Sequence, residues 1–270
     1  ALVTALDHRM TVTARASTSL ERGTLRLEIP ALRIDKIVAS TRELHEVREA
    51  GDLAILAVAI GTADLESRPA GFHLRIDSAI PSRSGFGSSA ALAVAVVAAC
   101  RRACNDDLAF DDLARLALSV ELRQHGRASG VDVQAVLRGG TLWCRRSEDG
   151  TFECEDLPAS TRLDAFRLFH SGVPDETTGD MVSSVRALRD RDLVRVREAF
   201  ATIEAATRDG HAALVGSDAA ALVAIVRRAQ AALETLGVVP EGVRASIRAI
   251  EAEGGAAKIS GAGFRTPTSS

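Results

Sequence analysis

The sequence has no tyrosine, one tryptophan and two methionines, and aromatic residues make up 3% of its 270 positions. It also lacks a charge bias, because it contains 33 Lys and Arg residues and 36 Asp and Glu residues, which give a formal net charge of −3. A balance this close to zero gives no electrostatic reason to expect nucleic acid or an anionic membrane surface as a partner. We therefore predict neither kind of partner.

Long apolar runs and targeting signals are missing as well. The longest uninterrupted apolar stretch, residues 90–100, is shorter than the roughly 20 residues of a bilayer-spanning helix. The opening residues ALVTAL contain neither an initiator methionine nor the basic lead of a secretory signal. With 46% hydrophobic and 26% charged residues, the chain can bury a sizeable core. We expect a piece of a longer, folded, cytoplasmic protein.

Cysteine is scarce, and its spacing argues against a framework of cross-links. The four cysteines stand at positions 100, 104, 144 and 154. Neither pair has C-x-x-C spacing, and no histidine cluster accompanies them. We expect reduced thiols of a cytosolic protein rather than zinc ligands or a disulfide.

Hydrophobic periodicity predicts a chain in which strands come first and helices follow. The predicted strands are residues 10–16, 24–29, 72–77, 136–144, 165–170 and 256–260. The predicted helices are residues 42–50, 52–65, 89–104, 111–124, 178–189, 192–208, 218–236 and 241–253. This order favours an α+β fold in two lobes over a regular βαβ alternation. We place an N-terminal lobe at about residues 1–155 and a C-terminal lobe at about residues 160–270.

A glycine- and serine-rich loop is the most informative stretch of the chain. Residues 81–91 read PSRSGFGSSAA, and they stand between a predicted strand and a predicted helix. Glycines allow a ligand to approach the backbone closely, and the start of a helix offers free N–H groups and the positive end of the helix dipole. Two serine hydroxyls add donors to phosphate and a candidate magnesium ligand. The loop therefore suits a polyphosphate.

Three other interpretations of this loop agree less well with its sequence. It lacks the Gly-Lys-Ser/Thr sequence of a Walker A loop. Gly85, Gly87 and Ala90 match the dinucleotide fingerprint G-x-G-x-x-A, with Asp106 and Asp107 as the acid downstream. That fingerprint requires a strand that runs directly into the first glycine and a second strand that delivers the acid, and neither is predicted here. An ordinary strand-to-helix turn explains the glycines but not the run SSAA.

Two carboxylates that can face a common cleft follow the loop. Glu121 lies near the end of a predicted helix, and Asp132 lies in the glycine-bearing turn after it. Transfer of a phosphoryl group from ATP to an alcohol needs a cation that neutralises the phosphates and a group that orients or deprotonates the hydroxyl. On their own, the two residues could equally be a surface charge and a turn residue.

Several segments together resemble the GHMP kinase superfamily, and most closely its mevalonate kinase branch. The loop at 81–91 resembles the phosphate loop P-x-x-x-G-L-G-S-S-A-A, with Phe86 in place of leucine. Residues 121–132, ELRQHGRASGVD, resemble E-x-x-x-H-G-x-x-S-G-x-D. Residues 171–182 are similar to T-G-x-P-x-x-T-x-x-L-V, and residues 258–263, KISGAG, resemble the third GHMP motif.

The resemblance implies a two-lobed GHMP kinase fold with the nucleotide in a cleft between the lobes. The implied activity is ATP-dependent phosphorylation of mevalonate to 5-phosphomevalonate, for isoprenoid precursor synthesis. Asp132 would act as the catalytic base, Ser89 and Glu121 would bind Mg²⁺, and Thr178 would line the substrate site, although a helix cap explains Thr178 equally well. The implied ATP-binding residues are Ser84, Gly85, Phe86, Gly87, Ser88, Ser89, Ala90, Gly261, Ala262 and Gly263. The resemblance also leaves room for a homodimer.

The chain departs from the family pattern at both ends. The first GHMP motif should precede Ala1 and is absent, and residues 264–267 replace the expected run of glycines. We therefore expect a truncated C-terminal lobe. Two alternatives stay open: another GHMP kinase that acts on phosphomevalonate or a sugar, and a non-catalytic ATP-binding relative.

Overall fold

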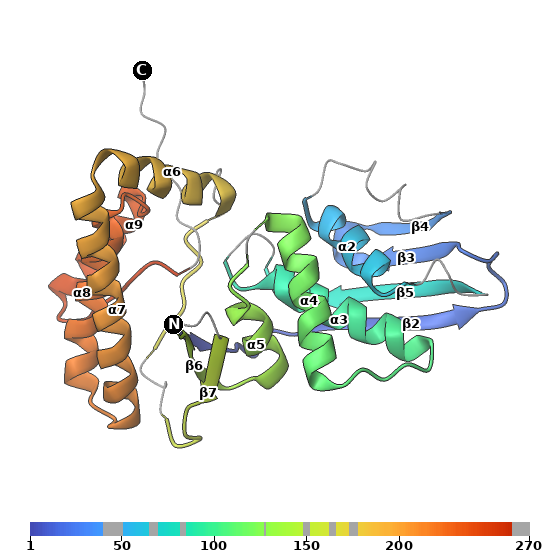
Figure 1. Ribbon diagram of the computed structural model, residues 1–270, viewed down its shortest axis with the longest axis horizontal. Helices are drawn as coiled ribbons and strands as arrows, with labels where there is room; N and C mark the ends of the chain where they lie inside the picture. Colours follow the sequence, from blue (N-terminus) through green and yellow to red (C-terminus); the bar gives the residue numbers. More distant parts are fainter. Residues whose placement is uncertain are drawn as a thin grey trace. The chain divides into compact units, whose positions relative to one another are not determined.

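The computed structural model describes residues 1–39, 51–64, 70–81, 85–126, 128–147, 152–161, 166–172 and 178–260. The chain divides into two compact units, and each is described by itself (Figure 1). The N-terminal unit comprises Thr4–Ser82 and Gly87–Gly139. The C-terminal unit comprises Ala1–Val3, Arg83–Phe86 and Gly140–Ser270.

A four-stranded mixed sheet forms the base of the N-terminal unit, with strand order β2-β5-β3-β4. Its strands are β2 (Met10–Ser17), β3 (Leu25–Ile29), β4 (Ile34–Val38) and β5 (Gly71–Ser78). Neighbouring strands are antiparallel except β3 and β5, which are parallel. A short 3-10 helix, η1 (Pro30–Leu32), joins β3 to β4.

Helices pack on one face of this sheet because alternate strand residues are apolar. Leu27 and Leu74 are fully buried at the centre, and their strand neighbours point to the opposite face. The covering helices are α2 (Gly51–Thr62), α3 (Ser88–Ala103) and α4 (Phe110–His125). Small apolar side chains such as Ala93 and Val97 of α3 join the same core, so the start of α3 is held firmly against the sheet.

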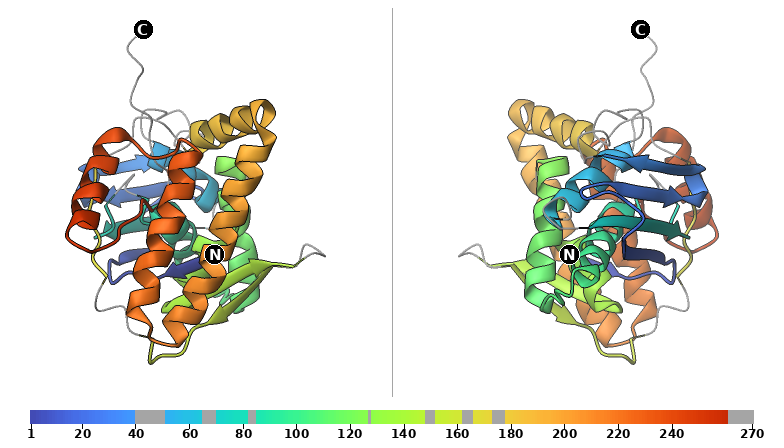
Figure 2. Two further views of the ribbon diagram at one scale, coloured as in Figure 1. Left: turned by 90° about the vertical axis from the view of Figure 1, so that its left-hand side faces the viewer. Right: turned by 90° about the vertical axis from the view of Figure 1, so that its right-hand side faces the viewer.

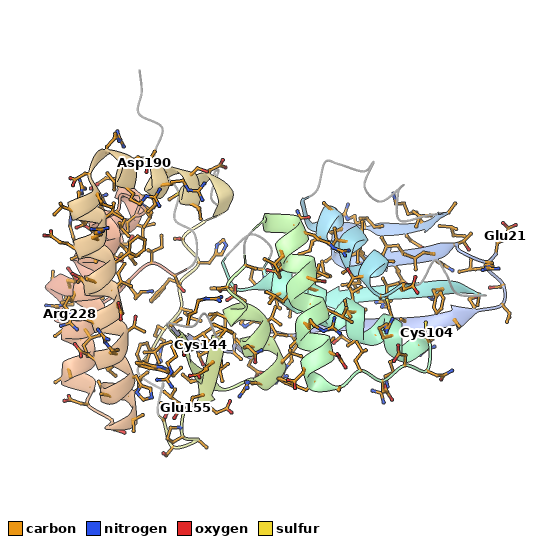
Figure 3. The ribbon with its side chains drawn as sticks, in the orientation of Figure 1. Glu21, Cys104, Cys144, Glu155, Asp190 and Arg228 are labelled. Atoms are coloured by element: carbon orange, nitrogen blue, oxygen red, sulfur yellow. A yellow bond between two sulfur atoms is a disulfide. The ribbon has the colours of Figure 1, made fainter. Side chains whose placement is uncertain are left out.

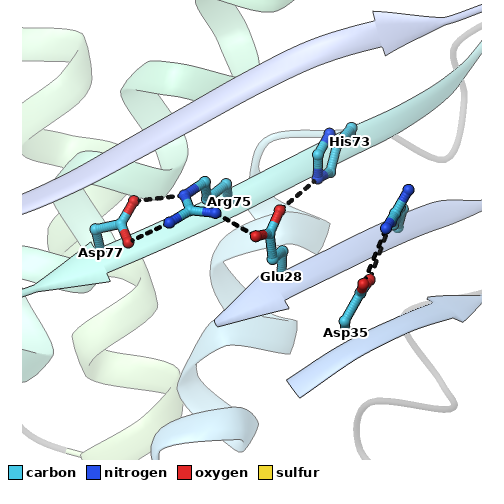
Figure 4. A network of polar contacts seen from close by, with 6 residues as sticks. Glu28, Asp35, His73, Arg75 and Asp77 are labelled. Carbon is cyan, nitrogen blue, oxygen red and sulfur yellow. Dashed lines mark hydrogen bonds and ion pairs between the residues drawn. The ribbon is translucent and has the colours of Figure 1, made fainter. Parts of the chain in front are cut away.

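The opposite face of the sheet carries a ladder of charged side chains (Figure 4). Glu28 of β3 contacts both His73 and Arg75 of β5, and Arg75 also forms an ion pair with Asp77. These side chains are partly exposed, and ion pairs of this kind contribute little to stability. The ladder marks this face as solvated rather than as part of the core.

The C-terminal unit combines a short sheet with four helices. The sheet has strand order β1-β6-β7, formed by β1 (Leu2–Thr4), β6 (Thr141–Arg146) and β7 (Phe152–Asp156). The helices are α6 (Thr178–Arg191), α7 (Leu193–Val215), α8 (Ala219–Thr235) and α9 (Glu241–Ala252).

Two long helices of this unit, α7 and α8, run side by side (Figure 2). Each begins at an aspartate whose side chain accepts a backbone hydrogen bond, Asp192 from Arg195 and Asp218 from Ala221. Such caps satisfy amides that the helix leaves unpaired. The ring of Trp143 on β6 packs edge-on against His211 of α7, with the ring centroids 4.1 Å apart.

The expectation of four reduced cysteines is wrong for two of them. Cys144 and Cys154 face each other across β6 and β7 and form a disulfide, with their Cα atoms 4.1 Å apart. Figure 3 labels Cys144 on the short sheet. Cys100 in α3 and Cys104 directly after it are free thiols, as expected. Spacing in the sequence did not reveal the pairing because it depends on strand register.

We expect the disulfide to stabilise the C-terminal unit. It closes a loop with a sequence separation of 10 residues, and the chain-entropy relation then predicts about 2–3 kcal/mol of unfolding free energy. Denaturant unfolding of Cys154→Ser and of the dithiothreitol-reduced protein measures the loss, with Cys104→Ser as the matched control. Superimposable unfolding curves, or four alkylatable thiols in the oxidised protein, would contradict this prediction.

Some elements differ from those predicted. Residues 136–138 belong to a helix, α5 (Val131–Arg138), and not to a strand. Residues 166–170 and 256–260 form no strand, and the helix predicted at 42–50 lies outside the described residues. Within the described part of the chain, no helix combines the length and apolar character that a membrane span requires.

Candidate active site

Two glycines in the left-handed conformation shape the turn before α3. Gly85 has a φ of 75° and Gly87 a φ of 70°, and residues with a Cβ atom rarely adopt this region. Gly87 is the N-cap residue of α3, and as a glycine it has no side chain that could accept a hydrogen bond from the helix. The first amides of α3 lie at the positive end of the helix dipole. This helix start suits an anion such as a phosphate group.

A hydroxyl and a carboxylate meet at the same helix start. Ser89, in the first turn of α3, donates a hydrogen bond from its Oγ to Oε1 of Glu121 on α4. Glu121 is 8% exposed and sits next to the fully buried Val120. Burying a carboxylate among apolar side chains is costly unless it is hydrogen-bonded or binds a cation. The structure thus brings together the two residues for which the sequence predicted a shared metal ion.

The donor set at Ser89 and Glu121 fits Mg²⁺. Among the described residues, no group of three or more His, Cys, Asp or Glu side chains is placed to hold a metal ion. Mg²⁺ does not need such a group, because it commonly binds one or two protein carboxylates together with substrate phosphates and water. One carboxylate and one hydroxyl beside the start of α3 meet that requirement.

Asp132 lies in the first turn of α5, close to the glycine that begins this helix. Gly130 caps α5 with a φ of 85° and no side-chain hydrogen bond. The Asp132 side chain is accessible, yet partial desolvation by the surrounding protein raises the pKa of its carboxyl above the usual value of an aspartate. A carboxylate that is accessible and more basic than usual can accept a proton from a bound hydroxyl.

An apolar cavity of about 280 Å³ opens beside the start of α3 in the N-terminal unit. Its walls come from β2, β3, β5, α2 and α3, with Met10, Leu56 and Leu92 among the apolar side chains. Ser88 and Ser89 also line the cavity, so it adjoins the start of α3. A flat, largely apolar ring attached to a phosphate group fits such a place.

The third predicted motif, residues 258–263, is described up to Ser260. The side-chain amine of Lys258 donates to the carbonyl of Ile259 at 2.8 Å, and desolvation lowers the pKa of this lysine. The backbone N–H of Ile259 donates to Oε1 of Gln230 on α8 at 3.0 Å. The approach to this motif is therefore fixed by side chains of its own unit.

Several predicted site residues lie outside the described part of the chain. They are Ser84, Gly261, Ala262 and Gly263. Thr178 is the first residue of α6, and its side chain is not among those described. Gly85 and Phe86 lie in the turn before Gly87, and Ala90 is buried in α3.

The dinucleotide interpretation of the loop finds no support in the described residues. Asp106 lies in the connection between α3 and α4 and forms an ion pair with Arg101 at 2.6 Å. No strand precedes it there, so it is not placed as the ribose-binding acid of a dinucleotide fold. Asp106 is instead held by its ion pair with Arg101, which lies in the last turn of α3.

Sequence reasoning missed the apolar cavity. Its lining residues, such as Ile29 and Ile76, have the alternation of ordinary strand core residues. The one local signal is η1, where Pro30 starts a turn immediately after a buried strand. That signal predicts a turn and not a hollow.

The central part of the chain matches a described family. Residues 51–140 match the "GHMP kinases N terminal domain". The match includes the start of α3, the Ser89–Glu121 pair and Asp132. Residues 51–140 are a GHMP kinase N-terminal domain.

Curated relatives extend the similarity beyond this GHMP domain. The mevalonate kinase of Aeropyrum pernix is 32% identical over 190 residues, which cover 70% of this chain and 57% of the relative. The mevalonate kinase of Archaeoglobus fulgidus is 32% identical over 194 residues, which cover 72% of this chain and 63% of the relative. The chain thus spans less than two thirds of the length of either relative.

A solved structure shows the same fold. The Methanococcus jannaschii mevalonate kinase superposes with a TM-score of 0.72 at 19% identity and covers 97% of this chain and 80% of its own. The predicted α+β GHMP kinase fold is therefore confirmed. The resemblance inferred from the motifs is confirmed with it.

Proposed function

We propose that the complete protein transfers the γ-phosphoryl group of ATP to the hydroxyl of mevalonate, giving 5-phosphomevalonate and ADP. The observation that carries this proposal is the Ser89–Glu121 pair at the start of α3, within a GHMP kinase N-terminal domain. The mevalonate kinase relatives support the choice of mevalonate as the acceptor. The use of ATP supports a cytoplasmic location, although a disulfide such as Cys144–Cys154 is rare in cytosolic proteins.

The nucleotide is assigned to the start of α3. The residues from Ser84 to Ala90 hold the triphosphate, and the base enters the apolar cavity lined by Leu56 and Leu92. The amides after Gly87 and the dipole of α3 attract the phosphate oxygens. Gly261, Ala262 and Gly263 are also assigned to ATP, and this assignment rests on the resemblance.

Ser89 and Glu121 are assigned to Mg²⁺ through the hydroxyl and carboxylate oxygens. A bound Mg²⁺ supplies positive charge that neutralises the phosphate oxygens during transfer. The chain's own contribution is to hold both ligands on packed helices, α3 and α4, so that little reorganisation is needed.

Asp132 is assigned to the acceptor alcohol. Its carboxylate takes the hydroxyl proton while the alcohol oxygen forms a bond to the γ-phosphorus and the bond from that phosphorus to the bridging oxygen of ADP breaks. Thr178 is assigned to binding of the alcohol. The resemblance allows a homodimer, and sedimentation of the complete protein tests whether one forms.

A panel of alcohols in an ADP-release assay tests the proposed function. We expect mevalonate to give the highest kcat/KM of a panel that also contains phosphomevalonate, galactose and homoserine. A higher kcat/KM for phosphomevalonate or a sugar would show that the protein is a GHMP kinase with a different acceptor. Calorimetric binding of magnesium-ATP without turnover of any alcohol would make it a non-catalytic relative.

The cavity assignment predicts a separate effect on the nucleotide base. Ala31 is exposed in η1 and lines the cavity, so Ala31→Phe fills the space without disturbing the core. We expect the KM for ATP to rise about tenfold, a loss of about 1.4 kcal/mol, while binding of inorganic triphosphate is unchanged. Ala16→Phe, exposed on β2 and outside the cavity lining, is the control. An unchanged KM for Ala31→Phe would place the base elsewhere.

A further inference from the structure

The Cys144–Cys154 disulfide joins two strands that are held in the C-terminal unit with unequal firmness. β6 is the central strand of the sheet β1-β6-β7, whereas β7 is an edge strand that pairs with β6 among the described residues. Leu142 and Cys144 of β6 are 0% and 1% exposed, but β7 contains no buried residue. Because a strand pair without buried apolar side chains is marginal in water, β7 has little stability of its own.

The other side-chain contacts described between β6 and β7 are made by exposed residues. Arg145 forms an ion pair with Glu153 at 2.9 Å, and 66% and 48% of these side chains are exposed. The guanidinium of Arg146 lies over the ring of Phe152, 5.7 Å from its centroid. Contacts of both kinds contribute little when they are exposed to water. The disulfide is therefore the strongest described link between the side chains of the two strands.

The backbone does not hold β7 at the disulfide itself. The N–H of Cys144 donates to the carbonyl of Ala1 at 2.7 Å and so points away from β7. Cys144 and Cys154 are thus a non-hydrogen-bonded pair of the β6–β7 ladder. At this pair, the covalent bond between the two sulfur atoms takes the place of backbone hydrogen bonds.

The two sulfur atoms differ in their access to solvent. Cys144 is buried in the central strand, whereas Cys154 is partly exposed on the edge strand. Thiol–disulfide exchange requires a thiolate to reach one of the two sulfur atoms directly. An incoming thiolate therefore attacks Sγ of Cys154, and Cys144 is the leaving group.

We propose that Cys144–Cys154 is a redox latch for β7: reduction by a small thiol such as glutathione releases this strand from β6, and oxidation fixes it again. One glutathione thiolate bonds to Sγ of Cys154, the disulfide breaks, and Cys144 leaves as a thiolate that takes up a proton. A second glutathione thiolate then displaces Cys154 and yields glutathione disulfide. Two electrons thus pass from two glutathione molecules to the protein, and glutathione disulfide reverses the steps.

A reversible disulfide goes beyond the proposed function and does not depend on it. Disulfides of cytosolic proteins are typically transient and often sense the redox state. A latch of this kind is therefore compatible with a cytoplasmic location, for which a permanent cross-link would be unusual.

The first part of the test follows the disulfide in the complete protein. The protein is incubated with increasing ratios of reduced to oxidised glutathione, and its thiols are alkylated and located by peptide mass. We expect the peptides that carry Cys144 and Cys154 to become alkylated as the ratio rises, and to be protected again when glutathione disulfide is restored. Mixed disulfide trapped at low pH should be found on Cys154.

The second part measures hydrogen exchange of β7. The N–H of Leu157 donates to the carbonyl of Thr141 at 2.8 Å, so the alternation of the ladder makes 143–155 and 145–153 hydrogen-bonded pairs. The amides of Glu153 and Glu155 therefore report the pairing of β7. Figure 3 labels Glu155 beside Cys144. We expect these amides to exchange about 30–100-fold faster after reduction, because the disulfide no longer closes the loop between the strands.

Matched controls separate release of β7 from damage to the whole unit. The amide of Ala206, buried in α7, should change its exchange rate by less than about threefold on reduction. The double variant C144A/C154A should exchange like the reduced protein in either glutathione buffer. Cys104→Ser removes a free thiol and should respond to glutathione as the wild type does.

Three results would overturn the latch. They are a disulfide that glutathione does not reduce while α7 stays protected, unchanged exchange at Glu153 and Glu155 after reduction, and acceleration at Ala206 as large as that in β7. None of these measurements requires turnover. A protein that phosphorylates no alcohol but shows the expected exchange would therefore disprove the proposed function and leave the latch in place.

Discussion

Asp132→Asn is expected to lower kcat of the complete protein by about 10²–10⁴-fold, the range typical of a lost general base. Asparagine has nearly the same size, but its amide cannot accept the proton of the alcohol. The KM for ATP should stay within about threefold, because the assigned ATP contacts at the start of α3 are unchanged. Steady-state kinetics with varied ATP and varied mevalonate measure both parameters.

The matched control for this variant is Asp111→Asn. Asp111 is also an exposed aspartate in the first turn of a helix, α4, but it lies outside the proposed site. Its kcat should equal that of the wild type. If Asp132→Asn kept more than about a third of wild-type turnover, the assignment of Asp132 as the base would be wrong.

The pH dependence gives a second measurement of the same role. The folded pKa of Asp132 is raised by desolvation, and the base must be ionised to work, so kcat should fall as the pH is lowered through this raised pKa. Because the native state binds this proton more tightly than the unfolded chain, ionisation of Asp132 above that pKa opposes folding. Asp132→Asn should therefore be at least as stable as the wild type at neutral pH. The residual kcat of this variant should not show the fall at low pH that protonation of Asp132 causes in the wild type.

Glu121→Gln should lower kcat/KM by about 10²–10³-fold, because several kcal/mol of charge stabilisation depends on the metal site. The amide oxygen still accepts the hydrogen bond from Ser89, so the variant removes charge while keeping the shape of the site. We also expect a higher concentration of Mg²⁺ to be needed for half-maximal activity. A magnesium titration at saturating ATP measures this shift.

Controls for the metal site vary charge and ligand separately. Ser89→Ala removes the hydroxyl ligand but keeps the carboxylate, so its activity loss should be the smaller of the two. Glu198 is an exposed residue of α7, and Glu198→Gln should change neither activity nor the magnesium requirement. A normal magnesium requirement in Glu121→Gln, with wild-type kcat/KM, would exclude Glu121 as a metal ligand.

Local sequence predicted the elements around the site well. The helices predicted at 89–104 and 111–124 differ by one residue at each end from α3 (Ser88–Ala103) and α4 (Phe110–His125). Glycines stop or start helices through their own backbone preference, as Gly87 and Gly126 do at φ values of 70° and 69°. Such signals lie within a few residues of the feature that they specify.

The predictions failed where pairing with distant residues decides the structure. The strand predicted at 136–144 begins as helix α5, because Gly130 starts a helix that buries Val133 and Ala135. The edge strands β4 and β7 were missed, since each is short and is held by one neighbour. Residues 256–260 have the apolar character of a strand, but they do not pair with one. The Gln230 side chain of α8 accepts the backbone hydrogen bond of Ile259, and Arg227 of α8 donates to the carbonyl of Gly255 just before them.

The sequence by itself determined the turns, the helix starts and the residue types that phosphoryl transfer needs, because these depend on neighbours along the chain. Only the tertiary structure decided that Ser89 reaches Glu121 across 32 residues, that Cys144 opposes Cys154, and that Gln230 holds Ile259. Each of these contacts depends on how separate elements pack, and packing is set by the whole core rather than by any local pattern.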